Sequence, residues 1–372
     1  MIDHLTTLAL ILALIHFGTP LTYYWYAKTK WLKKPWNIKT DKNYKPNITI
    51  IIPTYNEATL IKDKLENLRT QNYPKDKIKV IVVDSASKDN TTEIVEKYAK
   101  KHPDINLKLL REPVRTGKAH ALNLALKHAK GDIVFIADVD AKWPKNALSE
   151  AVKWFADPKV GAVSCLKKPV GSKIRDTEES YRQYYNILRV AESKAYATPI
   201  FHGELAAFRK ELLKKVGGFP TNIGADDSHT ATKIALLGFR AIVPEDLCIE
   251  EVIPNEGYFW WRVRRAQHLI QHFIKTLKEV RSHKVIGEFK RILALEFFLH
   301  IVNPWLLLAS ILLLAINIAM LSSLFAIGII ILGLTLLGIK RYRTWIAQQL
   351  YLVVATLRNL KSKEIVWSKQ AK

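Results

Sequence analysis

The chain has 372 residues, of which 49% are hydrophobic, and carries 57 Lys and Arg against 34 Asp and Glu, a net charge of +23. A disordered basic protein would lack these apolar residues, and a simple many-span transporter would not carry 24% charged residues, so the composition predicts a folded soluble domain. The two cysteines, Cys165 and Cys248, fit neither a disulfide framework nor a zinc site, which favours a reducing, cytosol-facing environment.

The first predicted element is an almost uncharged run from Leu5 to Ala27, long enough for one membrane span at about 20 residues per crossing. Aromatic residues from Tyr23 to Tyr26 crowd its end, as at a membrane interface. A cleaved signal peptide is the alternative, but residues 1–4 hold no Lys or Arg and the basic cluster follows the run. We therefore expect a retained transmembrane helix over residues 1–27.

Between residues 45 and 250, short apolar runs alternate with amphipathic stretches. Strands are expected at Ile48–Ile52, Val80–Val83, Leu107–Leu110 and Ile133–Ala137, and helices at Glu57–Gln71, Thr91–Lys101 and Lys118–Ala129. Continuous apolar strands between helices predict an α/β, Rossmann-like domain with a mostly parallel sheet covered on both faces. Ligands bind such sheets beyond the carboxyl ends of the strands.

Acidic residues, rather than glycine-rich phosphate loops, follow the predicted strands. The sequence contains no Gly-x-Gly-x-x-Gly after a strand and no Walker-type motif, so it does not support a nicotinamide or P-loop ATP site. Asp84 follows the second strand, and Asp138 and Asp140 follow the fourth. Two carboxylates at such a strand end are hard ligands that suit Mg²⁺ or Mn²⁺ bound to a diphosphate. A solvated turn explains many such pairs, and from the spacing alone this alternative stays open.

After the central domain, the composition predicts three segments: residues 251–291 as amphipathic interfacial helices, 292–340 as a two-helix transmembrane hairpin broken at Leu321–Ser323, and 341–372 as an amphipathic cytosolic tail. Glu296 and His300 lie in the first turns of the hairpin, either at the membrane interface or lining a functional cavity. Trp345–Leu360 is expected to lie on the membrane as a helix.

Most of the excess positive charge borders the predicted spans. Residues 28–34, 258–291 and 340–372 carry +4, +7 and +7, which make up +18 of the +23. The positive-inside rule then places the N-terminus outside, and the central domain and C-terminus in the cytoplasm, of a three-span protein of the cell membrane. Membrane lipids, and not nucleic acid, are the partners that this distribution predicts.

Five motifs in order resemble the family 2 glycosyltransferases with the GT-A fold. They are Ile50–Glu57, Val82–Thr91, Gly117–Asn123, Ala137–Asp140, and the region from Phe201 to Arg240 that contains Gly224–Asp227. The resemblance covers about residues 47–270 and extends to membrane-bound, inverting polysaccharide synthases and lipid-linked-sugar transferases. It implies a GT-A catalytic domain over residues 45–250, with transmembrane and interfacial helices on either side.

The resemblance implies a role for each matching residue. Nucleotide binding falls to Pro53, Tyr55, Glu57, Asp84, Lys118 and Asp138, the metal to Asp138 and Asp140, and the acceptor side to His202, Gly203 and Glu204. Asp227 becomes the general base, with Asp226 as a second carboxylate that raises one pKa of the pair. Tyr55 as a loop aromatic, Glu57 as a first-turn helix charge and His202 as a hydrogen-bonded loop residue are the structural alternatives.

The sequence departs from the family pattern at two places. In the interfacial Gln-x-x-Arg-Trp motif of the processive members, Arg262 replaces Gln and Ala266 replaces Trp if Arg265 takes the arginine position. Ser85 stands where the family often has a second Asp. Arg262, Arg264 and Arg265 are expected to contact the diphosphate, and an anionic lipid surface is their alternative partner.

The function that this reasoning predicts is inverting transfer of a hexosyl or N-acetylhexosaminyl group to a lipid-linked or membrane-proximal glycan. The expected donor is a nucleotide sugar, UDP-linked in preference, used with Mg²⁺ or Mn²⁺. One alternative is a processive synthase that translocates a β-linked polysaccharide, and another is a catalytically silent membrane scaffold. The altered interfacial motif disfavours the processive alternative, and the set of Asp84, Asp138, Asp140 and Asp227 disfavours the scaffold.

Overall fold

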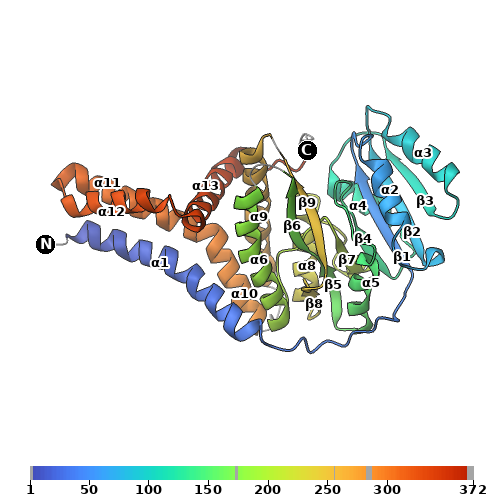
Figure 1. The fold of residues 1–372 in the computed structure, drawn as a ribbon, viewed down its shortest axis with the longest axis horizontal. Coiled ribbons are helices and arrows are strands. Elements are labelled where there is room, and N and C mark those ends of the chain that lie inside the picture. The colour runs from blue at the N-terminus through green and yellow to red at the C-terminus, as the bar shows by residue number, and fades with distance from the viewer. Residues whose placement is uncertain (1–2, 172–174, 255, 282–286, 367–372) are drawn as a thin grey trace.

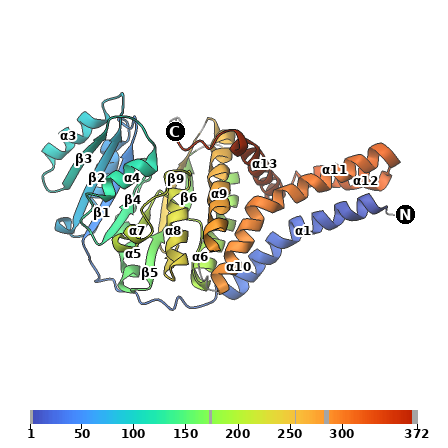
Figure 2. The ribbon, with the colours of Figure 1, turned by 180° about the vertical axis from the view of Figure 1, so that it is seen from behind.

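A computed structural model describes residues 3–171, 175–254, 256–281 and 287–366 (Figure 1). The parts of the predicted segments 1–27, 251–291 and 341–372 that fall in residues 1–2, 255, 282–286 and 367–372 lie outside this description. An α/β domain stands at one end of the molecule and an arm of long helices projects from the other, with the N-terminus at the tip of the arm (Figures 1 and 2).

The main sheet has seven strands in the order β3-β2-β1-β4-β7-β5-β8. Its strands are β1 (Ile48–Thr54), β2 (Ile78–Ser85), β3 (Asn106–Glu112), β4 (Ile133–Ile136), β5 (Val160–Ser164), β7 (Ala206–Arg209) and β8 (Arg240–Ile242). The first four are parallel neighbours, whereas β7 runs antiparallel to both β4 and β5. The prediction of a mostly parallel sheet in an α/β domain is therefore confirmed, and the antiparallel strand is an addition that sequence reasoning missed.

The central strands are apolar along their whole length because helices cover both faces of the sheet. Ile50, Ile51 and Ile52 are consecutive residues of β1, and none of them is exposed to solvent. The covering helices are α2 (Ile61–Arg69), α3 (Thr91–Lys101), α4 (Lys118–Leu126), α5 (Ala147–Val152), α7 (Lys210–Lys215) and α8 (Asp226–Leu236). Burial on both faces removes the alternation that marks a half-exposed strand.

Helix α2 begins four residues later than the predicted start at Glu57. Asn56 has a positive φ of 56°, which an α-helix does not allow, and its N–H donates to the Ser87 hydroxyl at 2.8 Å. The Ala58 N–H donates to Asp89 at 3.1 Å in the same way. The turn after β1 is therefore held open by the turn after β2, which leaves residues 55–60 free of helix at the edge of the sheet.

A second, two-stranded sheet joins the α/β domain to the helices next to the arm. It pairs β6 (Leu166–Gly171) with β9 (Cys248–Ile253) in parallel, and it lies beside α6 (Arg175–Ala195) and α9 (Tyr258–Val280) (Figure 1). Cys165 is buried, Cys248 is exposed, and both are free thiols.

The arm contains two helices that are long and apolar enough to cross a membrane, His4–Trp31 and Gly287–Leu321. The first is α1 (His4–Tyr26) with a π-helical end, and the second is α10 (Gly287–Phe297), a π-helical turn (Phe298–Val302) and α11 (Asn303–Leu321). A third span results if α12 (Leu324–Leu336) and α13 (Lys340–Lys361), which meet at an angle of 105°, count as one. The turn at Ser322, with φ 48°, falls at the predicted break of the hairpin.

Buried polar contacts hold the arm against the domain. The Tyr23 hydroxyl of α1 donates to Glu192 of α6 at 2.6 Å, and Arg189 of α6 pairs with both Glu192, at 3.1 Å, and Glu296 of α10. Glu296 is fully buried and also lies 3.3 Å from His300. Because three helices share these charges, the arm has one orientation that satisfies all of them.

Gly131 lies two residues before β4, and its replacement tests how closely the sheet is packed. A Cβ atom at Gly131 would overlap with the backbone of Ile48 and Thr49, so the backbone must shift to admit a side chain. We expect Gly131→Ala to lower the free energy of unfolding by about 2 kcal/mol or more, as overpacked positions do. Gly18→Ala is the control, because no heavy atom lies within 4 Å of its Cβ position. Thermal unfolding in detergent measures both, and equal midpoints would contradict the close packing at Gly131.

Candidate functional site

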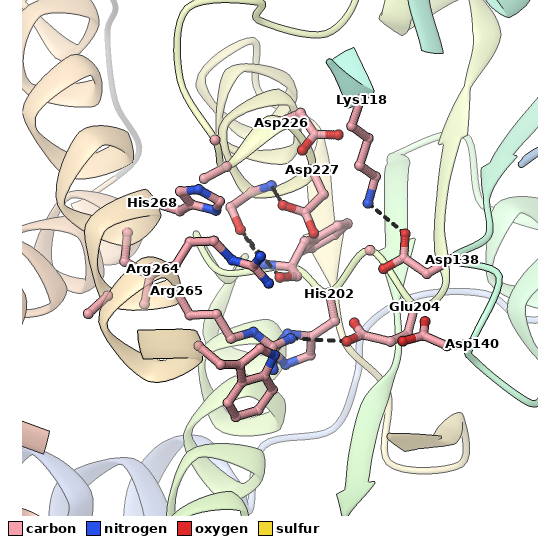
Figure 3. A pocket seen from close by; sticks show the side chains of 18 of the residues that line it. Lys118, Asp138, Asp140, His202, Glu204, Asp226, Asp227, Arg264, Arg265 and His268 are labelled. Atoms are coloured by element: carbon pink, nitrogen blue, oxygen red, sulfur yellow. Dashed lines mark hydrogen bonds and ion pairs between the residues drawn. The ribbon is translucent and has the colours of Figure 1, made fainter. Parts of the chain in front are cut away.

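A cavity of about 510 Å³ lies where β1 and β4 end, between the α/β domain and helices α6, α9 and α13 (Figure 3). Almost all of the predicted site residues line it: Pro53, Tyr55, Glu57, Lys118, Asp138, Asp140, His202, Gly203, Glu204, Asp226, Asp227, Arg262, Arg264 and Arg265. Of the predicted set, Asp84 alone is absent from the lining. The structure thus brings together residues that span more than two hundred positions of the sequence.

Charged groups converge at the centre of the cavity. The Lys118 ammonium lies 2.7 Å from an oxygen of Asp138 (Figure 3). A Cβ atom on Gly203 would sit 2.7 Å from that ammonium and 3.3 Å from one oxygen each of Asp138 and Asp227. The glycine therefore keeps a small space open among one cation and two carboxylates. Burial would lower the pKa of Lys118, but the carboxylates of Asp138, Asp226 and Asp227 together raise it above its ordinary value.

Asp226 and Asp227 begin helix α8 and turn toward this centre (Figure 3). One oxygen of Asp227 accepts a hydrogen bond from the Ser228 N–H at 2.7 Å. Burial, reinforced by the negative charge of Asp226, raises the pKa of Asp227 to about 7 although Lys118 opposes the shift. A carboxylate with a pKa near neutrality is suited to remove a proton and release it again at that pH.

The centre fits a divalent cation that takes part of its ligands from a substrate. Among the described residues, no group of three or more His, Cys, Asp or Glu side chains is placed to hold a metal ion unaided. Mg²⁺ and Mn²⁺ in phosphate-transfer sites are commonly held by one or two carboxylates plus phosphate oxygens. Asp138 and Asp140 supply two such carboxylates in the lining of the cavity, and the space kept open by Gly203 adjoins Asp138.

We call the part of the cavity beside Tyr55 and Lys118, which are predicted to bind a nucleotide, the nucleotide side. Sequence reasoning missed Arg115 and Ser85, which also line the cavity. The Arg115 guanidinium lies 3.7 Å from the centre of the Tyr55 ring, so the two form a flat stacked pair at the rim. Asp84 instead accepts hydrogen bonds from the Ser87 N–H, at 3.0 Å, and from the Ser87 hydroxyl. Its carboxylate therefore holds the turn after β2.

Two of the three arginines predicted to contact a diphosphate are engaged by carboxylates. Arg262 pairs with Glu178 at 3.1 Å, and Arg265 pairs with Glu204 at 3.0 Å and with Glu251. Arg264 lies on the same face of α9 as His268 (Figure 3), and burial together with the neighbouring Arg265 charge lowers its pKa to about 10. Like Lys118, Arg264 lines the cavity, so it brings a second positive charge to the same hollow.

The charges beside His202 form a buried ladder. Lys167 pairs with Glu204 at 2.5 Å and with Glu251 at 3.0 Å. Arg182 continues the ladder, 2.9 Å from Glu251 and 3.1 Å from Glu178. Burial and the nearby Lys167 and Arg182 charges lower the pKa of His202 well below its ordinary value, so its imidazole is neutral at pH 7.

The cavity continues from this ladder to the arm. Tyr181 and Tyr185 of α6, Trp261 of α9 and Tyr351 of α13 line this half, and His300 of the long apolar helix closes it. His300 therefore lines the cavity, as one of the two predictions for it stated, whereas Glu296 lies behind it. The same hollow connects the carboxylate centre with a candidate membrane span.

The segment after α13 also reaches the cavity, which sequence reasoning missed. Ile365 and Val366 line its nucleotide side. A Cβ on Gly117, whose φ is 110°, would meet the Val366 side chain at 3.2 Å. Arg358 holds the segment through an ion pair of 2.8 Å with Glu364. The part of the predicted cytosolic tail that the structure describes is thus a wall of the site.

Comparison with known proteins gives two strong matches. The family Glycosyl transferase family 2 matches residues 49–217. The solved structure of the mannosyltransferase PcManGT from Pyrobaculum calidifontis, in complex with GDP-Man and Mn²⁺, is 53% identical in sequence with a TM-score of 0.89. That likeness covers 96% of this chain and 99% of PcManGT, so it includes the helical arm as well as the α/β domain.

More distant relatives share less of the chain. Poly-beta-1,6-N-acetyl-D-glucosamine synthase of Staphylococcus epidermidis is 28% identical over 287 residues, which are 74% of this chain and 68% of that protein. The structure of S. aureus TarS is 24% identical with a TM-score of 0.51, covering 69% of this chain and 44% of TarS. At that identity the TarS likeness concerns the fold alone.

A buried lysine supports the loop that carries Asp138 and Asp140. Lys64 of α2 is 2% exposed, and its ammonium donates to the Ala141 carbonyl at 2.6 Å and lies 4.4 Å from the centre of the Trp143 ring. Burial lowers its pKa from 10.5 to about 7, although Asp138 and Asp140 oppose the shift. This lysine therefore loses its proton in the folded chain at a pH where the unfolded chain keeps it.

The shift predicts a pH dependence of stability. Between pH 7 and pH 10.5 the unfolded chain binds a proton at Lys64 that the folded chain lacks, so the contribution of Lys64 to stability rises with pH. From pH 7 to 9, wild type should gain about 2 kcal/mol in free energy of unfolding relative to Lys64→Met. Lys62→Met, at an exposed position of the same helix, is the control. Parallel pH profiles of wild type and Lys64→Met, from unfolding titrations, would refute the shift.

Proposed function

Because the chain belongs to the family 2 glycosyltransferases with the GT-A fold, we propose that it transfers a mannosyl group from GDP-mannose to a sugar hydroxyl of a lipid-linked glycan. That the chain is a glycosyltransferase using a nucleotide sugar follows from its family and relatives. The observation that supports the finer proposal is the convergence of Lys118, Asp138 and Asp227 around the space at Gly203, in a cavity whose lining continues to His300 of the long apolar helix.

The choice of donor rests on the relative with the greatest likeness in the comparisons above. PcManGT is in complex with GDP-Man, and it is 53% identical to this chain over almost its whole length. The sequence motifs favour a UDP-linked donor instead, and this remains the alternative that a donor screen must separate. A hexosyl rather than an N-acetylhexosaminyl group follows from the likeness to PcManGT.

The proposed reaction is a single displacement at the sugar carbon bonded to the diphosphate. Asp227 takes the proton of the acceptor hydroxyl, whose oxygen forms the new bond to that carbon as the bond to the diphosphate oxygen breaks. Lys118 and Arg264 stabilise the charge that collects on the departing diphosphate. A divalent cation held by Asp138 and Asp140 would neutralise more of that charge when bound. One displacement inverts the anomeric configuration, so an α-linked donor yields a β-linked product.

The charges in the acceptor half of the cavity favour a neutral acceptor group. The cations there are paired with carboxylates, and all of them except the partly exposed Arg265 are buried: Lys167, Arg182, Arg189, Arg262 and Arg265. A phosphate would have to break one of these pairs, and disrupting a buried pair costs about 3–5 kcal/mol. The faces of Tyr181, Tyr185 and Trp261 suit the apolar face of a sugar ring instead.

The position of this half next to the arm supports an acceptor that is anchored in the membrane. His300, at the end of the cavity, belongs to the apolar helix Gly287–Leu321. We propose that the chain crosses the cell membrane three times, with the N-terminus outside and the α/β domain in the cytoplasm, as its basic segments predict. The acceptor sugar then lies at the cytoplasmic surface, within reach of Asp227.

A donor screen tests the substrate assignment. Purified protein with Mn²⁺ should turn over GDP-mannose with a kcat/KM about tenfold or more above that for UDP-glucose and UDP-N-acetylglucosamine, because a hydrogen-bonded base pocket discriminates strongly. Chelation of the metal should remove most of the activity, and added Mn²⁺ or Mg²⁺ should restore it. Release of GDP or UDP measures each reaction.

The same screen separates the alternatives. Preference for a UDP-sugar would overturn the donor assignment while leaving the transferase reaction intact. Chain length of the product, measured by mass spectrometry, distinguishes addition of single sugars from processive synthesis. Processive synthesis is the second candidate because of the likeness to the Staphylococcus epidermidis synthase. Absence of turnover with every donor would favour the silent scaffold.

Replacement of the general base gives a sharper test of mechanism. Asp227→Asn should lower kcat by about a thousandfold, within the range of a lost general base, and leave donor affinity nearly unchanged. Wild-type kcat should fall as pH drops through about 7, because protonated Asp227 cannot accept the hydroxyl proton. Asp226→Asn removes a charge that raises this pKa, so its acid limb should move to lower pH. An Asp227→Asn enzyme with wild-type kcat would disprove the assignment.

A further inference from the structure

The loop that leads into the general base is held by helix α9. The Gly224 N–H donates to Oε1 of Gln271 at 2.9 Å, two residues before Asp226. The imidazole of His268, one turn earlier on α9, occupies the place that a Gly224 side chain would need. Lys275 adds a third contact, donating to the Asn222 side chain at 2.7 Å. One face of α9 therefore holds the loop from which the carboxylate pair starts.

The other end of the Gln271 amide contacts the last turn of α13 and the segment after it. Its Nε2 donates to Oδ1 of Asn359 at 2.9 Å and to the carbonyl of Lys363 at 2.7 Å. An amide nitrogen has two donors and no acceptor, so these two oxygens dictate which way the side chain turns. With its nitrogen facing Asn359 and Lys363, Gln271 necessarily presents its oxygen to Gly224.

The segment that orients Gln271 is the same one that forms a wall of the nucleotide side, through Ile365 and Val366. The chain therefore has a continuous hydrogen-bonded connection from that wall, through one buried amide that is 5% exposed, to the loop of the general base. We propose that Gln271 is a positioning residue for Asp227, and that the segment Ser362–Val366 keeps it in the orientation that this task requires. The inference rests on the proposed role of Asp227 as the base.

Placement of the base is sensitive to small shifts. A general base works within hydrogen-bond reach of the proton that it removes, and a displacement of about 1 Å can cost about a hundredfold in rate. Without the Gln271 oxygen, the Gly224 N–H loses its acceptor and the start of α8 loses an anchor. Lys118 and Asp138 belong to other elements, so their positions do not depend on Gln271, whereas the segment that carries Ile365 and Val366 is held by both Gln271 and Gln267.

Gln267 provides a matched comparison one turn away. Its Nε2 donates to the Ser362 carbonyl and approaches Asn359 Oδ1 at 3.5 Å, so it too holds the segment after α13. Its Oε1, however, is buried without a hydrogen-bond partner among the described residues. Gln267 thus shares the burial and the segment contact of Gln271, but its oxygen does not hold the base loop.

The experiment compares Gln271→Met with Gln267→Met in the full-length enzyme, using GDP-mannose and Mn²⁺. Gln271→Met should lower kcat by about tenfold, because it releases Gly224. Both variants loosen the segment that lines the nucleotide side, so they should change the KM for the donor by a similar factor. Gln267→Met should keep kcat within about threefold of wild type. Gln271→Glu keeps an oxygen for the Gly224 N–H but sets its other oxygen against the acceptor oxygens of Asn359 and Lys363, so the segment no longer orients it and kcat should fall as well.

The outcomes for these variants support or overturn the positioning role of Gln271. Wild-type kcat in Gln271→Met, or an equal loss of kcat in Gln267→Met, would overturn the positioning role. If Gln271→Met does not fold, wild-type kcat in a folded Gln271→Glu would overturn it as well. An inactive wild type, or an active Asp227→Asn, would instead count against the proposed function, so the two failures are distinguishable.

Discussion

The site depends on one constraint, the close approach of several negatively charged side chains to a single point. Asp138 and the pair Asp226–Asp227 come from different elements, yet all of them approach the ammonium of Lys118, the first residue of α4. Carboxylates this close together repel one another, so the folded state requires a cation among them. Lys118 supplies it, and the remaining negative charge is where we propose that a divalent cation binds.

The half of the cavity lined by Tyr181, Tyr185 and Trp261, where we propose that the acceptor binds, has the opposite arrangement of charge. There the cations are buried, and Glu178, Glu204 and Glu251 are the shared carboxylates that balance them. A buried ion pair is stable only when the geometry satisfies both partners, so each shared glutamate also fixes the relative positions of the elements that it joins. The ladder ties β6 and β9 to α6 and α9, and thereby sets the distance between the domain and the arm.

The centre of this site could be predicted from the sequence because local patterns determine it. Residues that follow buried parallel strands must gather at one edge of the sheet, and this rule places Asp138 and Asp140, after β4, in one cavity with Tyr55 and Glu57, after β1. The motif order supplied Asp226 and Asp227. The partners of Arg262 and Arg265 escaped prediction, because Glu178 and Glu251 are distant in sequence and carry no motif of their own. The turn position of Asp84 and the contribution of Val366 likewise depend on tertiary packing.

The fate of the arginines also changes what the net charge of +23 means. The basic stretch at 258–291 borders an apolar span. The positive-inside rule counts its residues whether their side chains are exposed to solvent or buried in the protein. Arg262 is only 5% exposed and Arg265 is bound to two glutamates, so neither is available to an anionic lipid surface. The charge excess that predicts topology is therefore partly an internal one, which holds the acceptor half of the site neutral. In the proposed reaction, an acceptor sugar binds beside a charged diphosphate. The neutral half of the cavity then favours the sugar, and the charged half favours the diphosphate.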